Sequence, residues 1–81
     1  MENRIAVLGI VLDNPEMSQS VNAILHDYGD VIIGRMGIPY REKNVAVISV
    51  AVDTDADKIS ALTGKLGKLN GVNVKAAISK K

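Results

Sequence analysis

The sequence contains no cysteine, tryptophan or phenylalanine, and its only histidine is His26. The lack of cysteine excludes disulfides, thiolate nucleophiles and thiolate metal sites, and it favours a cytoplasmic location. One histidine cannot complete an imidazole site within a single chain, although an oligomer could bring two copies of His26 together. We therefore expect neither a metal nor a cofactor.

Long apolar segments are also missing. The longest, residues 5–12, is far shorter than the ~20 residues that a helix needs to cross a bilayer, and it lacks the features of a signal peptide. We expect no membrane association. The 81 residues suffice for one domain, residues 1–81, which at this size gains stability from self-association.

No arrangement typical of catalysis is present. The serines have no histidine base near a strand-turn-helix elbow, which argues against a hydrolase triad. Asp53, Asp55 and Asp57 alternate, but they lack the central glycine and the terminal glutamate of an EF-hand loop, and helix capping explains them better. The sequence predicts a protein that is not an enzyme.

Four segments have the composition of strands. Residues 4–13 and 45–53 are apolar on both alternating sets, as in strands buried on two faces. Residues 30–38 contain two glycines and precede Pro39, which cannot donate to a ladder, so this strand should lie at a sheet edge. Residues 72–79 are apolar on one face only, which also predicts an edge.

Two helices are predicted between these strands. Apolar residues recur every three or four positions in residues 17–28 and again in residues 59–69. Asn14 is expected to cap the first helix, and Gly29 is expected to end it in a left-handed conformation.

The order strand-helix-strand-strand-helix-strand predicts an α+β fold. Two right-handed crossovers give a ferredoxin-like βαββαβ sandwich, in which an antiparallel sheet of strand order 4-1-3-2 carries both helices on one face. The second apolar set of the central strands then needs another cover, and a second copy of the chain is the simplest one. We expect a homo-oligomer, either a dimer or a tetramer.

Charge is distributed unevenly along the chain. Residues 1–57 hold nine acids and four bases, a net charge of −5, whereas residues 58–81 hold six lysines and no acid, a net charge of +6. A lysine-rich segment can bind nucleic acid, but neighbouring strands can also bring the two halves together and neutralise them. The second interpretation is favoured because the arginines and aromatics of nucleic-acid grooves are absent from this segment.

The segment GRMGIPYRE, residues 34–42, is unusual in composition. Arg35 and Arg41 suit a carboxylate or a phosphate, Gly37 allows close backbone approach, and Tyr40 adds a hydroxyl group. The alternative is a bent edge strand with a hairpin turn, in which Arg35 pairs with an acid such as Asp30 or Glu42. The residues alone leave both interpretations open.

Three segments together resemble a known family: RIAVLGIVLDNPE, VNAILHDYGDVIIGRMGIPYRE and ISALTGKLGKLNGVNVKAAIS. They are similar to the regulators of the iron-only hydrogenase system, over almost the whole chain. The resemblance implies a ferredoxin-like domain that is related to ACT modules and to the ligand-binding half of the nickel-responsive regulator. It implies a regulatory role without catalysis.

The resemblance also suggests where a ligand would bind. In ACT modules a small ligand lies at a subunit interface beside the first strand-to-helix turn, which is here formed by Leu12, Asp13 and Asn14, with the first helix of a neighbouring copy. The nickel-responsive relative binds metal through histidines and a cysteine, so nickel binding does not carry over to this chain. Its DNA-binding segment does not precede the first strand either, so any control of transcription is expected to act through a partner.

The leading hypothesis is therefore an oligomeric regulatory module that senses a small-molecule effector or a protein partner of the hydrogenase system. One alternative is a structural interaction module that assists hydrogenase assembly. Another is nucleic-acid binding through the lysine-rich carboxyl-terminal third.

Overall fold

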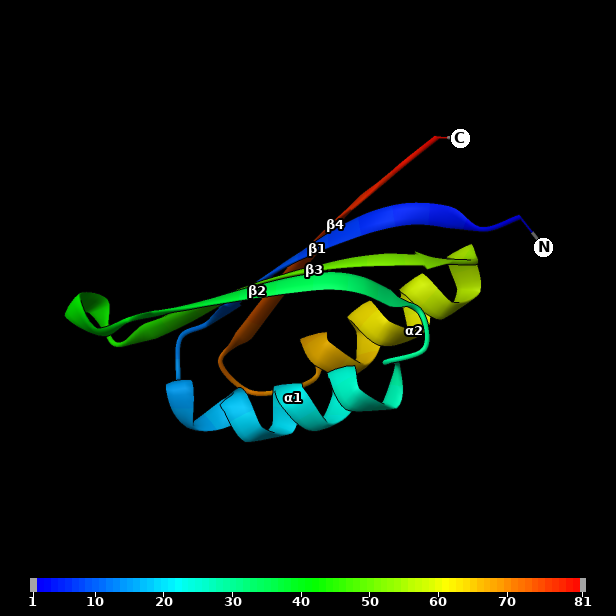
Figure 1. The fold of residues 1–81 in the computed structure, drawn as a ribbon. Helices are drawn as coiled ribbons and strands as arrows, with labels where there is room; N and C mark the ends of the chain where they lie inside the picture. Colours follow the sequence, from blue (N-terminus) through cyan, green and yellow to red (C-terminus); the bar gives the residue numbers. More distant parts are fainter. Residues whose placement is uncertain (1, 81) are drawn as a thin grey trace.

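A computed structural model describes residues 2–80 (Figure 1). Its elements follow the predicted order, with a short 3₁₀ helix before α1 and another in the β2–β3 connection. Their bounds are β1 Arg4–Leu12, η1 Pro15–Met17, α1 Ser18–Asp27, β2 Ile32–Tyr40, η2 Arg41–Lys43, β3 Val45–Thr54, α2 Ala56–Gly67 and β4 Val72–Ile78.

The four strands form one antiparallel sheet of order β2-β3-β1-β4, which confirms the predicted ferredoxin-like topology. The register places Leu8 of β1 between Val50 of β3 and Ala76 of β4. Both helices lie against one face of the sheet, and Figure 1 shows the opposite face bare. The hairpin of β2 and β3 extends beyond the helices and ends in η2.

The core lies between the helices and the sheet. Alternate residues of β1 are buried and exposed, so Leu8, Ile10 and Leu12 point toward the helices and are fully buried. Residues at helical spacing complete this layer: Val21, Leu25, Ile59, Leu62 and Leu66. Aliphatic side chains are thus sufficient to fill the space between the helices and the sheet.

A side-chain cap begins each helical segment, but Asn14 caps the 3₁₀ helix η1 and not α1 itself, whose N-cap residue Met17 makes no side-chain cap bond. The side-chain oxygen of Asn14 accepts a hydrogen bond of 3.0 Å from the backbone N–H of Glu16, and Pro15 follows as the first residue of η1. The Oδ1 atom of Asp55 accepts a hydrogen bond of 2.9 Å from the N–H of Lys58 at the start of α2.

The predicted left-handed end of α1 at Gly29 is wrong. The N–H groups of Tyr28 and Gly29 donate to the carbonyls of Leu25 and His26, three residues earlier, so the last turn tightens without a positive φ. Among the described residues, only Asn44 and Gly71 have positive φ angles, of 54° and 75°. Because the turns after α1 continue to Val31, β2 begins at residue 32 and not at residue 30.

Candidate functional site: the uncovered sheet face and the sheet edge

The sheet face that points away from the helices is rich in exposed apolar side chains. Ile5, Val7 and Val11 of β1 are 43%, 44% and 39% exposed, and Met36 and Ile38 of β2 are 60% and 49% exposed. We call this surface the open sheet face. The register assigns to it Ile5, Val7, Gly9, Val11, Gly34, Met36, Ile38, Tyr40, Val45, Val47, Ser49, Ala51, Asp53, Asn73, Lys75 and Ala77.

The open sheet face is not flat. Gly34 and Ala51 are cross-strand partners, as are Met36 and Ser49, so small residues lie next to a long side chain. Val7 completes a shallow hollow of about 270 Å³ over these positions. A surface with both projecting side chains and a hollow can pack against another apolar surface more closely than a flat one.

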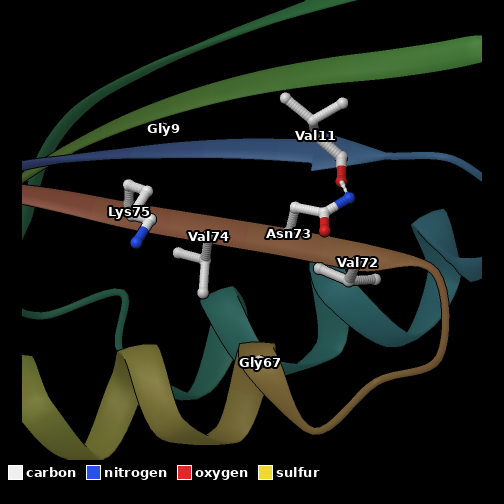
Figure 2. Close-up of a pocket in the computed structure, with 7 residues that line it drawn as sticks. All are labelled: Gly9, Val11, Gly67, Val72, Asn73, Val74 and Lys75. Atoms are coloured by element: carbon white, nitrogen blue, oxygen red, sulfur yellow. Dashed lines mark hydrogen bonds between the residues drawn. The ribbon is translucent and has the colours of Figure 1, made fainter.

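A second hollow, of about 480 Å³, lies along the outer side of β4 (Figure 2). We call it the β4-edge groove, and it is lined by Gly9, Val11, Gly67, Val72, Asn73, Val74 and Lys75. Figure 2 shows Val74 pointing from β4 toward α2, where Gly67 has no side chain to fill the space.

Asp13 and Asn14, two of the predicted ligand-binding residues, lie just after β1 and already have partners in the chain. The Oδ2 atom of Asp13 accepts a hydrogen bond of 3.0 Å from Asn73, and its N–H donates to the carbonyl of Gly71 over 2.7 Å. Asn14 accepts from Glu16, as described for the cap. These contacts attach the first strand-to-helix turn to the start of β4.

Arg35 and Gly37 lie on the other face of β2 from Tyr40. The Nη2 atom of Arg35 donates a hydrogen bond of 2.6 Å to the side-chain oxygen of Asn22 in α1, and not to Asp30 or Glu42 as the structural alternative proposed. The partner of Glu42 is Tyr40, whose hydroxyl group donates a hydrogen bond of 3.1 Å to the Glu42 carboxylate. Gly37 pairs with Ile48, whose side chain is buried on the helix side.

The predicted set is therefore divided into two parts. Tyr40 pairs with Val45, and Leu12 pairs with Ala46, so β1 and β2 reach the same end of the sheet. Four of the predicted residues lie there: Asp13 and Asn14 follow β1, Tyr40 ends β2, and Arg41 follows β2. Arg35 is five residues from Tyr40 along β2, or about 17 Å at the usual strand rise, and points toward α1.

Within residues 2–80, no group of three or more His, Cys, Asp and Glu side chains is close enough to hold a metal ion. No helix in this part of the chain is both long and apolar enough to cross a bilayer. The two hollows and the apolar face offer area and shape, which are features of binding surfaces.

Sequence reasoning anticipated an uncovered apolar face but missed the β4-edge groove. The groove depends on Gly9 and Gly67, which are far apart in the sequence and meet only through the β1–β4 register and the packing of α2 on β4. Glycine in the interior of a strand was the one available signal.

Residues 4–76 match the model of the TM1266-like family, described as "Iron-only hydrogenase system regulator, putative". The chain belongs to this family. The match covers most of the chain and confirms the resemblance seen in the three sequence segments.

Solved structures agree with this family. The uncharacterized protein TM1266 from Thermotoga maritima is 42% identical and superposes with a TM-score of 0.92, over 98% of this chain and 100% of that one. The ACT domain from GTP pyrophosphokinase of Chlorobium tepidum superposes with a TM-score of 0.72 at 19% identity, over 100% of this chain and 91% of that one, which shows a shared fold.

Curated relatives of this family member carry the name "Putative nickel-responsive regulator". The protein from Saccharolobus solfataricus is 30% identical over 66 residues, and that from Saccharolobus islandicus is 27% identical over the same length. The match covers 82% of this chain and 49% of each relative. The chain thus spans about half the length of the curated relatives it matches.

Proposed function

We propose that this chain is a non-catalytic regulatory module of the iron-only hydrogenase system that works as a homodimer through its open sheet face. The family and the curated relatives are all named as regulators, which supports a regulatory role. The observation that carries the dimer is the exposed apolar surface of β1, β2 and β3 opposite the helices.

The open sheet face has the size that a dimer requires. Four strands at about 4.8 Å spacing and about eight residues at about 3.4 Å rise give roughly 500 Å² for each copy. Two copies would bury about 1,000 Å², the lower limit for a specific interface. An exposed apolar patch of a few hundred Å² is often a functional interaction site.

The surface is also suited to a symmetric partner. A two-fold dimer brings the same patch of each copy together, so projecting and hollow regions must be self-complementary. The open sheet face has both, with Met36 and Ile38 projecting beside the hollow at Gly34 and Ala51. Asp53 lies at one end of this face and Lys75 at its β4 side, so charge is confined to the rim.

A small-molecule effector would bind at the end of the sheet formed by Asp13, Asn14, Tyr40 and Arg41. Arg41 can pair with a carboxylate or a phosphate, and Tyr40 belongs both to this end and to the open sheet face. Occupation of this end would therefore alter the dimer. Arg35 and Gly37 would contribute only if the bond between Arg35 and Asn22 opens.

Complementation in cells tests this function. We expect cells without the chain to show altered hydrogenase transcript or activity, which the wild type restores and Ile38→Glu does not. Ala23→Glu is the control, because Ala23 is an exposed residue of α1, away from the open sheet face and from β4. Equal rescue by both variants would exclude the open sheet face from the function.

A thermal-shift panel of amino acids, nucleotides, divalent metals and short DNA separates the remaining alternatives. An effector at a hundred times its Kd should stabilise the chain by about 2.7 kcal/mol, and Arg41→Ala should abolish that shift. Salt-sensitive binding of DNA would favour the nucleic-acid alternative. Co-purification with a hydrogenase protein, and no shift with any small molecule, would favour the assembly module.

A further inference from the structure

The outer edge of β4 offers unpaired backbone groups. The N–H of Asp13 donates to the carbonyl of Gly71, and the N–H of Ser79 donates to the carbonyl of Ile5, so the odd-numbered residues of β4 face β1. In an antiparallel ladder, the even-numbered residues Val74 and Ala76 then direct their N–H and C=O groups outward. No strand among the described residues pairs with this side of β4.

The two edges of the sheet differ in this respect. At the outer edge of β2, Pro39 has no N–H to donate, and the register shifts between Ile32 and Gly34, as in a β-bulge. Proline and bulges are the usual means of protecting an edge from further pairing. β4 contains no proline, and its register with β1 is continuous.

The β4-edge groove provides room for side chains on both sides of an added strand. Val74 and Gly67 line it on the helix side, and Gly9, Val11 and Lys75 line it on the open side. A Cβ atom at Gly67 would meet only Cγ1 of Val74, at 3.7 Å, which is ordinary contact. An extended segment places successive side chains on alternate faces, and the groove accepts both sets.

The charge around the β4-edge groove indicates which kind of segment would bind there. Lys75 is the only charged residue that lines the groove, Lys68 follows Gly67, and residues 58–81 contain six lysines and no acid. Two copies paired through β4 would bring these lysines together, at an electrostatic cost. An acidic segment would gain from the same charges.

We propose that the β4-edge groove binds an extended acidic segment of another protein, which joins the sheet as a fifth strand. The proposal names a partner chemistry for the regulatory module described above, and it rests on that function only for its biological role. Gly9 and Val11 belong to both surfaces, whereas Gly67 lines the groove on the helix side alone, so a variant at Gly67 tests the groove without changing the open sheet face.

Selection from a phage-displayed octapeptide library against the pure chain tests the proposal. We expect enrichment of peptides that combine acidic with β-branched residues. The most enriched peptide should bind Gly67→Leu at least about tenfold more weakly than the wild type, a loss of about 1.4 kcal/mol. Gly64→Leu, one turn earlier on α2 and outside the groove, should bind it as the wild type does.

Both leucine variants should fold. Neither glycine has a positive φ, no atom lies within 4 Å of a Cβ at Gly64, and leucine favours a helix over glycine. Sedimentation should give the same mass for both variants as for the wild type, which separates peptide binding from dimer formation.

Amide hydrogen exchange supplies the backbone readout. The outward N–H groups of Val74, Ala76 and Ile78 should exchange fast in the free chain and slowly with the selected peptide bound. Three results would each overturn the proposal: no acidic enrichment, equal binding to Gly67→Leu and Gly64→Leu, or no new protection at these three amides.

Discussion

The side chains of Arg35 and Asn22 form a hydrogen bond of 2.6 Å that joins the edge strand β2 to helix α1. Nothing else that is charged or polar links these two elements across the described part of the chain. Arg35 therefore has a structural partner, and its effect on stability can be measured apart from any ligand.

Replacing Arg35 with alanine should destabilise the fold by less than about 1 kcal/mol, because the bond is exposed to water. Urea unfolding of Arg35→Ala, Asn22→Ala and the double variant measures the coupling between the two side chains. A double variant whose destabilisation equals the sum of the two single effects would show that the bond contributes nothing in solution.

Gly71 should be sensitive to a single methyl group. Its φ angle is 75°, and an added Cβ would lie 3.4 Å from Cβ of Asn14. A residue with a side chain is destabilised by about 1–2 kcal/mol in this left-handed conformation. Gly71→Ala should therefore lower the free energy of unfolding by at least that amount. Gly37→Ala, which meets no atom within 4 Å, is the control and should cost less.

The cap at the start of α2 gives a third prediction. Asp55→Ala removes the acceptor of the N–H of Lys58 and should destabilise the chain by about 1 kcal/mol. Asp53→Ala, at an exposed position near the end of β3, should have a smaller effect because its carboxylate caps no helix. Chemical denaturation at one pH measures both, and equal losses would contradict the capping role.

The strand order could be predicted from the sequence because burial on two faces requires a different composition from burial on one. β1 and β3 carry Val, Ile and Leu in both alternating sets, and Pro39 marks β2 as an edge. The same reasoning located the open sheet face, since the two helices cover only one side of these strands.

The candidate site was harder to predict because it depends on contacts between distant elements. Arg35 bonds to Asn22 and not to Asp30 or Glu42, since its position in β2 places it on the helix side. Gly29 was expected to be left-handed because glycine often ends helices, but local turns satisfied the last carbonyls first. The spacing of residues in the sequence shows neither the partner of Arg35 nor the turns that end α1 at Gly29.

Sedimentation of the pure chain most directly tests the central claim, that a second copy covers the open sheet face. The chain has a mass of 8.6 kDa, so we expect twice that mass for the wild type and for Ala23→Glu, and 8.6 kDa for Ile38→Glu. A buried, unpaired carboxylate at Ile38 should separate the copies. A wild type that sediments as a monomer at high concentration, or an Ile38→Glu variant that remains a dimer, would contradict the account.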